Sequence, residues 1–97
     1  NKVTVNYDIG NSAANGYDPV EEFNAYGQKI TDLHIKDRLL HGPPVILGNG
    51  NADIPKVFEL LTKFNYLGII IFQAFRDDEG IKIFQDQFNW FLKNIKL

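Results

Sequence analysis

A strand followed by a helix, repeated three times, is the feature that most constrains how this chain can fold. Residues 8–17, which are rich in glycine and asparagine, and residues 37–53 interrupt this order and are predicted to be loops. The alternation of strands and helices is typical of an α/β structure with a parallel sheet. The spacing of apolar residues predicts strands at 2–7, 30–36 and 69–73 and helices at 19–26, 54–64 and 80–96.

The uncovered face of such a sheet favours its closure into a barrel. Right-handed connections place all three helices on one face, and nothing else in these 97 residues can cover the other face. Closure with further strands into an eight-stranded α/β barrel, which needs about 250 residues, would cover it. We therefore expect residues 1–97 to be about three-eighths of a single barrel domain. Such a piece needs the missing part of the barrel or forms a homo-oligomer. The uncovered side chains are Thr4, Asn6, Asp8, Asp32, His34, Lys36, Ile69, Ile71 and Gln73.

Composition excludes several classes of partner. The chain has a net charge of −2, whereas nucleic-acid-binding domains usually carry a basic surface, so we expect no nucleic acid as a partner. No apolar run approaches the roughly 20 residues that span a bilayer, so we expect no membrane contact. The absence of cysteine and of a charged and apolar leader favours a cytoplasmic location.

Polar side chains at the predicted strand ends indicate a metal site. Alternation along residues 31–38 places Leu33 on one face and His34 on the other. Asp8 and Gln73 end the other two strands on the same face as His34. Functional groups of parallel barrels lie at the carboxyl ends of the strands. These oxygen and nitrogen donors suit one divalent ion, Mn²⁺, Zn²⁺, Co²⁺ or Mg²⁺.

Each of these residues also has a plainer interpretation. Asp8 could be a turn residue that accepts a hydrogen bond from its own backbone, as aspartate often does. A single histidine such as His34 in a strand is more often structural than a metal ligand. Gln73 alone indicates almost nothing. The shared face of the three side chains is therefore what favours a metal site over three separate structural roles.

Three cations near the strand ends are predicted to bind substrate. Lys36 and Arg38 follow the second strand, and Arg76 follows the third. An arginine can hold a phosphate group through two parallel hydrogen bonds, and a lysine adds a point charge. The alternative for the first two is a salt bridge with a carboxylate such as Asp32 or Asp37, and the alternative for Arg76 is a solvated position in a loop.

Five short motifs follow one another along the chain: Tyr7-Asp-Ile-Gly-Asn-Ser12, Gly16-Tyr-Asp-Pro19, His34-Ile-Lys-Asp37, Leu47-Gly-Asn-Gly50 with Asp53, and Tyr66-Leu-Gly68. Their order and spacing resemble the sugar phosphate isomerase/epimerase family of xylose-isomerase-like TIM barrels. The resemblance implies a TIM (β/α)8 barrel in which residues 1–97 supply strands six to eight and their helices. It also implies one divalent metal, held by Glu, Asp, His and Glu, and proton transfer between neighbouring sugar carbons through a cis-enediolate. Asp8 and His34 match the Asp and His ligands, and the first Glu would lie upstream.

Two positions depart from this family pattern. Gln73 falls where the last Glu is implied, and glutamine can offer an oxygen to a metal but cannot act as a base. This departure argues against two-base epimerisation and leaves polarisation of the carbonyl by a metal with a single upstream base. Asn11 stands where the endonuclease IV branch has a histidine of a three-zinc cluster. With only His34 and His41 present, that cluster cannot be completed, which disfavours DNA repair.

The sequence thus leads to one main functional hypothesis and two alternatives. The main hypothesis is a metal-dependent sugar or sugar-phosphate isomerase or epimerase, whose main base lies upstream of this chain. Gln73 in place of Glu favours the first alternative, a barrel without catalysis that binds a sugar or a partner. The second alternative is a hydrolase or lyase on the same scaffold.

Overall fold

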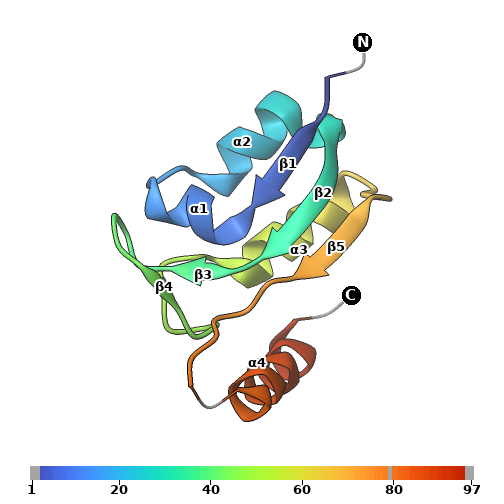
Figure 1. Ribbon diagram of the computed structural model, residues 1–97. Helices are drawn as coiled ribbons and strands as arrows, with labels where there is room; N and C mark the ends of the chain where they lie inside the picture. The colour runs from blue at the N-terminus through green and yellow to red at the C-terminus, as the bar shows by residue number, and fades with distance from the viewer. Residues whose placement is uncertain (1–2, 79, 96–97) are drawn as a thin grey trace.

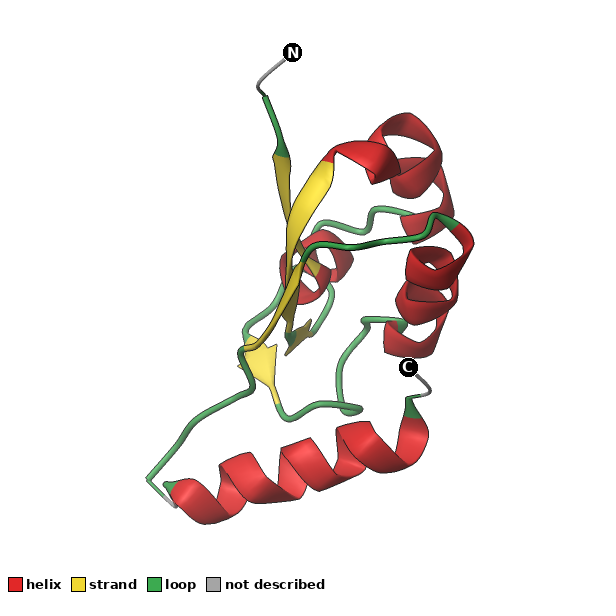
Figure 2. Ribbon diagram, turned by 90° about the vertical axis from the view of Figure 1, so that its right-hand side faces the viewer, coloured by secondary structure: helices red, strands yellow, loops and turns green. Residues whose placement is uncertain are grey.

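The computed structural model describes residues 3–78 and 80–95. Three strands, β1, β2 and β5, form a parallel sheet in that order, and β3 and β4 form a small antiparallel hairpin. Helices α2 and α3 lie together on one face of the sheet (Figures 1 and 2). The predicted fold class, consecutive βα units of an α/β barrel, is confirmed. The elements are β1 (Val5–Asp8), α1 (Ile9–Ala14), α2 (Pro19–Tyr26), a 3₁₀ turn (Gly27–Lys29), β2 (Ile30–Ile35), β3 (Asp37–Arg38), β4 (Pro44–Val45), α3 (Ile54–Lys63), β5 (Ile69–Phe72) and α4 (Ile81–Asn94).

Alternation along the strands separates the core from the uncovered face. Tyr7 and Leu33 are partners in the register of β1 and β2, and their side chains are 3% and 0% exposed. The next partners, Asp8 and His34, point to the opposite face and are half-buried. The core between the sheet and its helices also contains Phe23, Ile30, Ile35, Val57, Phe58, Leu60 and Leu61.

Helices α2 and α3 begin where the sequence predicts because an aspartate caps each of them. Asp18 accepts a hydrogen bond from the N–H of Val20 at 3.0 Å, and Asp53 accepts one from the N–H of Lys56 at 3.1 Å. In both helices a proline lies in the first turn, where its missing N–H costs nothing. These local signals are strong enough to fix both helix starts without tertiary information.

The prediction of a loop at residues 8–17 is wrong, because its first half forms the short helix α1. Asp8 caps this helix, since its Oδ1 accepts a hydrogen bond from the N–H of Asn11 at 2.8 Å. The glycine and asparagine of α1 have low helix propensity, so burial of its apolar side chains stabilises it. Gly10 allows this packing, because a Cβ there would lie 3.0 Å from the backbone carbon of Lys36.

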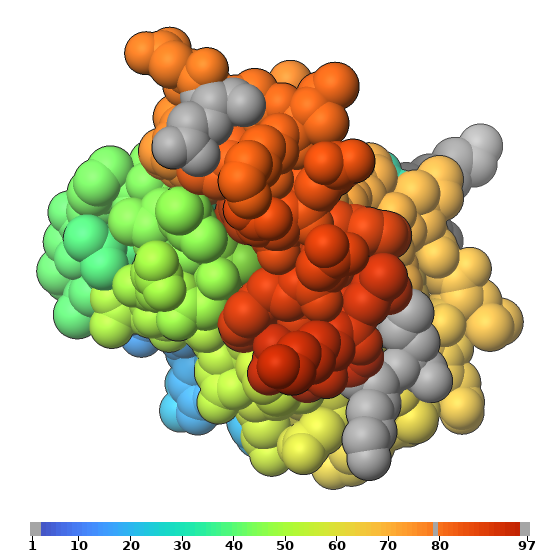
Figure 3. All heavy atoms as spheres, turned by 90° about the horizontal axis from the view of Figure 1, so that it is seen from below, coloured from blue at the N-terminus to red at the C-terminus, as the bar shows by residue number. Residues whose placement is uncertain are grey.

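Residues 37–53 are largely irregular, as predicted, but they contain a hairpin that the sequence did not reveal. Asp37 pairs with Val45 and Arg38 pairs with Pro44 in the antiparallel hairpin of β3 and β4. Seen from below, the chain around this hairpin lies beside α4 (Figure 3). The long segment is therefore a packed part of the fold that reaches from the strand ends to the last helix.

Helix α4 crosses the lower end of the sheet and does not run back beside β5 (Figures 1 and 2). Phe91 and Ile95, which are 4% and 6% exposed, join the common core. Phe72 at the end of β5 packs edge-to-face on Phe84, with 5.2 Å between ring centroids. Ile81, at the start of this helix, is 75% exposed. None of the helices in the described part of the chain combines the length and apolarity needed to cross a bilayer.

The sheet face opposite α2 and α3 is open. Ile69 and Ile71 lie on this face and are 62% and 39% exposed. β1 and β5 are the two edges of the described sheet. Exposed apolar side chains and unpaired strand edges both favour association with another chain.

We expect the isolated 97-residue chain to associate in solution, which sedimentation velocity at several concentrations measures. Replacing Ile69 and Ile71 with lysine should shift the population towards monomer, because charged side chains oppose pairing of exposed sheet surfaces. Ile81→Lys is the matched control, since Ile81 is exposed on α4 and away from the sheet. A monomer with sharp cooperative thermal unfolding would contradict the expectation.

Candidate functional site

The three predicted metal ligands lie side by side at the carboxyl ends of adjacent strands. Asp8 and His34 are paired residues in the register of β1 and β2. Gln73 directly follows β5, and its Oε1 lies 2.9 Å from Nδ1 of His34. The backbone N–H of Gln73 also donates to the carbonyl of Ile35 at 3.0 Å, which extends the ladder between β2 and β5. The parallel sheet thus gathers side chains that are far apart in the sequence.

Asp8 can cap a helix and still offer an oxygen to a cation, because its carboxylate has two oxygens. Oδ1 accepts the hydrogen bond from the N–H of Asn11 that caps α1. The plainer interpretation of Asp8 is therefore realised, as a helix cap. Within the described part of the chain, Oδ2 takes part in no hydrogen bond, so this oxygen remains available to a cation.

The contact with Gln73 decides which nitrogen of His34 is available. An amide oxygen only accepts, so Nδ1 of His34 carries the proton and donates it to Oε1 of Gln73. Nε2 then keeps its lone pair, which is the form in which a neutral imidazole binds a metal. Gln73 therefore orients the imidazole, a role that stands beside its predicted role as a ligand.

The donors of Asp8 and His34 fit part of the coordination shell of a divalent cation. A carboxylate oxygen and an imidazole nitrogen on one face are a donor set that such ions accept. Among residues 3–78 and 80–95, no three His, Cys, Asp or Glu side chains gather closely enough to hold an ion by themselves. Further ligands would have to come from the rest of a complete barrel.

Two of the three predicted substrate-binding cations share a pocket with Gln73. This open pocket has a volume of about 420 Å³ and lies beside the ends of β2 and β5. Arg38 does not line it. Its lining residues are Lys36, Pro44, Gln73, Ala74, Phe75 and Arg76.

Arg38 instead joins the β3–β4 turn to α1. Its Nε and Nη2 donate to the carbonyl of Gly42 at 3.0 and 2.7 Å. Its Nη1 donates to Oδ1 of Asn11 at 3.0 Å. Three N–H groups of the guanidinium are thus occupied by neutral oxygens and not by the carboxylates that the sequence suggested. Lys36 and Arg76 are better placed than Arg38 to contact a ligand.

Asp37 organises the long loop, a role that sequence analysis did not identify. Its side chain is 1% exposed. Oδ2 accepts hydrogen bonds from the N–H groups of Gly48 and Gly50 at 2.9 and 3.0 Å, and Oδ1 accepts one from Ala52 at 3.0 Å. A Cβ at Gly50 would lie 2.2 Å from Oδ1, so only glycine fits there. The Gly-Asn-Gly run after a strand-end aspartate was the available signal.

Gln87 fixes the loop that carries Arg76. It is 1% exposed, and its Oε1 accepts hydrogen bonds from the N–H groups of Leu47 and Phe75, each at 3.1 Å. Its Nε2 donates to the carbonyl of Phe75 at 2.7 Å. The signal in the sequence was a polar residue midway between Ile83 and Phe91 on the apolar row of α4.

A carboxylate with three hydroxyl donors holds α1 against α2 on the helix-covered side. Oε1 of Glu22 accepts hydrogen bonds from the hydroxyls of Tyr7, at 2.8 Å, and Ser12, and Oε2 accepts one from Tyr26 at 2.8 Å. Burial, with the nearby charge of Glu22, raises the pKa of Tyr7. The same two causes raise the pKa of Tyr26 to about 12. This network holds α1, the helix that Asp8 caps, in place from the helix-covered side of the sheet.

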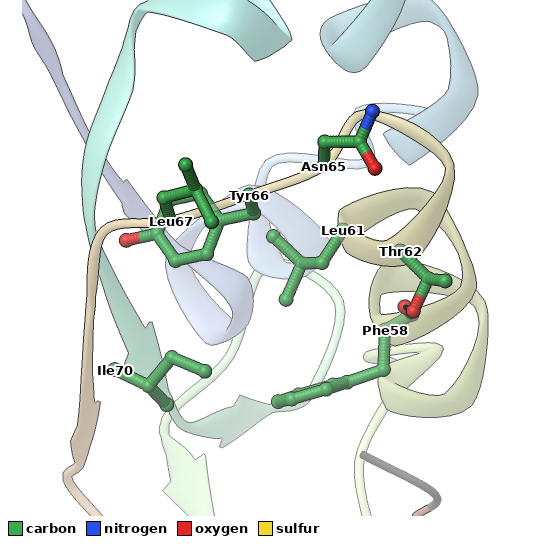
Figure 4. Close-up of a pocket in the computed structure, with 7 residues that line it drawn as sticks. All are labelled: Phe58, Leu61, Thr62, Asn65, Tyr66, Leu67 and Ile70. Atoms are coloured by element: carbon green, nitrogen blue, oxygen red, sulfur yellow. Dashed lines mark hydrogen bonds between the residues drawn. The ribbon is translucent and has the colours of Figure 1, made fainter.

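A second cavity, of about 340 Å³, lies on the helix-covered side between α3 and β5 (Figure 4). The hydroxyl of Tyr66 donates to the carbonyl of Ile69 at 2.6 Å. Burial and then the charge of Asp32 raise the pKa of Tyr66. Among the described residues, the lining contains no histidine and no carboxylate, so it lacks the side chains that divalent metals most often bind. It consists of Phe58, Leu61, Thr62, Asn65, Tyr66, Leu67 and Ile70.

Two bacterial relatives resemble this chain over most of its length. Inosose dehydratase of Geobacillus kaustophilus (strain HTA426) is 30% identical, and the match covers 79% of this chain and 31% of that protein. Rhizopine catabolism protein MocC of Rhizobium meliloti is 28% identical, with 78% of this chain and 29% of that protein covered. The chain spans less than a third of the length of each of these relatives.

A solved structure shares the fold described above. The sugar phosphate isomerase/epimerase from Parabacteroides distasonis ATCC 8503 superposes with a TM-score of 0.65 and 26% identity, over 89% of this chain and 28% of that one. The family model described as xylose isomerase-like TIM barrel matches residues 1–94. This chain, with its parallel βα units and with Asp8, His34 and Gln73 at its strand ends, belongs to the xylose isomerase-like TIM barrel family.

Proposed function

We propose that residues 1–97 form strands six to eight, with their helices, of a metal-dependent sugar or sugar-phosphate isomerase or epimerase. One observation carries the proposal: Asp8, His34 and Gln73 form a row at the carboxyl ends of adjacent parallel strands. Functional groups of such barrels lie at this end. The names of the relatives agree with a sugar or a sugar derivative as substrate.

Each residue of the row has a defined part in this proposal. Asp8, through Oδ2, and His34, through Nε2, would hold a divalent ion, and a bound ion of this kind polarises a carbonyl oxygen of the substrate. Gln73 keeps the imidazole of His34 in place through Nδ1. The reaction moves a proton between neighbouring carbons through an enediolate. Gln73 cannot take up that proton, so the base lies in the upstream part of the barrel.

A barrel without catalysis that binds a sugar or a partner is the second candidate. Gln73 at a position where the family pattern has Glu is the observation that favours it.

Loss of water, the reaction in the name of the dehydratase relative, is a further outcome of the isomerase chemistry, because elimination also starts with removal of a proton beside a carbonyl. The two catalytic reactions share the base and the polarised carbonyl and differ in the fate of the enediolate.

We expect the full-length protein that contains this chain to exchange substrate hydrogen for deuterium in the presence of Mn²⁺. Ketoses and ketose phosphates incubated in D₂O and followed by NMR would report the exchange. An isomerase or epimerase returns a deuterated sugar isomer, whereas a dehydratase releases a product that lacks water. Absence of exchange with every sugar tested, while a sugar still binds, would favour the barrel without catalysis.

Gln73→Glu in the same assay should lower the rate of exchange by about tenfold, as changes to the partners of metal-binding histidines commonly do. The physical reason is that a carboxylate that accepts from Nδ1 makes the imidazole of His34 a stronger electron donor to a bound ion, and this lowers the ability of the ion to polarise a carbonyl. Gln85→Glu is the matched control, because Gln85 is an exposed residue of α4 and should leave the rate unchanged. A gain of activity in Gln73→Glu would instead show that the native site has lost a catalytic carboxylate.

A further inference from the structure

Lys36 and Arg76 face the pocket beside the strand ends and have no partner among the residues that the structure describes. No hydrogen bond or salt bridge joins either side chain to another group within residues 3–78 and 80–95. Two other cations are engaged, since Lys56 pairs with Glu59 at 3.3 Å and Arg38 donates to two oxygens. The pocket therefore has two cations that form no hydrogen bond or salt bridge with a described residue.

The fold positions the stem of Lys36 and the backbone next to Arg76. The stem of Lys36 packs on Gly10, where an added Cβ would lie 3.0 Å from Cγ of the lysine. Arg76 follows Phe75, whose backbone N–H and carbonyl are both held by the buried side chain of Gln87. The two side chains thus come from the ends of different strands and converge on one pocket because of tertiary contacts.

The charge around this pocket favours an anion. Among the described residues, its lining includes no aspartate or glutamate, although the chain as a whole has a net charge of −2. Two like charges on one pocket repel each other, and a bound anion between them removes that repulsion. A planar guanidinium can bind a phosphate or carboxylate through two hydrogen bonds, and an ammonium group adds a compact charge.

We propose that Lys36 and Arg76 bind an anionic substituent of the sugar, a phosphate or a carboxylate. This inference rests on the proposed function, because Gln73 lines the pocket and also contacts His34, so a ligand in the pocket lies next to the metal-binding row. The volume of about 420 Å³ suits a small sugar with one such group. The substrate is therefore an acidic sugar and not a neutral one.

The test is calorimetric titration of inorganic phosphate into the metal-free full-length protein. The double variant Lys36→Gln, Arg76→Gln keeps much of each side chain and removes both charges. We expect it to weaken phosphate binding by about tenfold or more, since each charge-assisted hydrogen bond contributes substantially to affinity. Lys56→Gln removes an exposed cation that does not line the pocket, and this variant should bind phosphate as the native protein does.

A parallel titration with acetate distinguishes the two anions. Tighter binding of phosphate than of acetate supports a sugar phosphate, and equal binding supports a sugar acid. Equal phosphate binding by the native protein and the double variant, or no binding of either anion, would overturn the proposal. The titration involves no turnover and no metal. Missing exchange activity would therefore contradict the proposed function but not the anion site. An active enzyme that binds neither anion would contradict the anion site but not the proposed function.

Discussion

Replacing Asp37 with alanine is expected to lower the free energy of unfolding by about 3 kcal/mol, because one buried carboxylate satisfies three backbone N–H groups. These donors belong to Gly48, Gly50 and Ala52, and alanine offers them no acceptor. The side chain is 1% exposed, so a cavity remains where water has little access. Urea unfolding of the full-length protein, followed by circular dichroism, measures the change.

Two further variants separate the causes. Asp37→Asn keeps the shape of the side chain but turns an N–H donor towards backbone donors, so it should lose most of the same free energy. Asp53→Ala removes the cap of α3, a single hydrogen bond at an exposed position, and should cost only about 1 kcal/mol. Equal effects of Asp37→Ala and Asp53→Ala would show that Asp37 does not organise the loop.

Replacing His34 with alanine is expected to weaken Mn²⁺ binding by at least about 100-fold, because loss of a ligand exceeds the effect of losing a ligand's partner. Nε2 of His34 is the available nitrogen in the row, and its ring is already oriented by Gln73. Calorimetric titration of Mn²⁺ into the metal-stripped full-length protein measures the affinity. Asp8→Asn should also weaken binding, since it removes the charge but keeps an oxygen that can cap α1.

The other histidine provides the control. His41 lies in an exposed loop with a φ of 54°, a backbone conformation that asparagine tolerates, so His41→Asn should bind Mn²⁺ as the native protein does. Unchanged affinity in both His34→Ala and Asp8→Asn would rule out the strand-end row as a metal site. The barrel that only binds a sugar or a partner would then be the better account of Gln73.

Local patterns in the sequence were sufficient to predict the three parallel strands and the residues of the candidate site. Alternation alone placed Asp8 and His34 on the face opposite Tyr7 and Leu33, and the register of β1 and β2 agrees with it. Asp18 and Asp53 cap α2 and α3 at their predicted starts, and capping is an interaction between residues a few positions apart. Both kinds of signal lie within a single strand or helical turn.

Local sequence patterns could not predict helix α1 or the roles of the buried polar side chains. α1 has weak local propensity, and packing on Lys36 and the core makes it helical. Asp37 and Gln87 look like surface residues in the sequence, yet each is buried because backbone groups from distant segments converge on it.

The sequence by itself determined that this chain is a parallel α/β piece with Asp8, His34 and Gln73 at its strand ends, since a two-residue period fixes which face a side chain takes. Only the tertiary structure decided how the nearby cations are used. Arg38 bonds to Gly42 and Asn11, whereas Lys36 and Arg76 are left facing one pocket. Such choices depend on contacts between segments far apart in the chain, about which local periodicity contains no information.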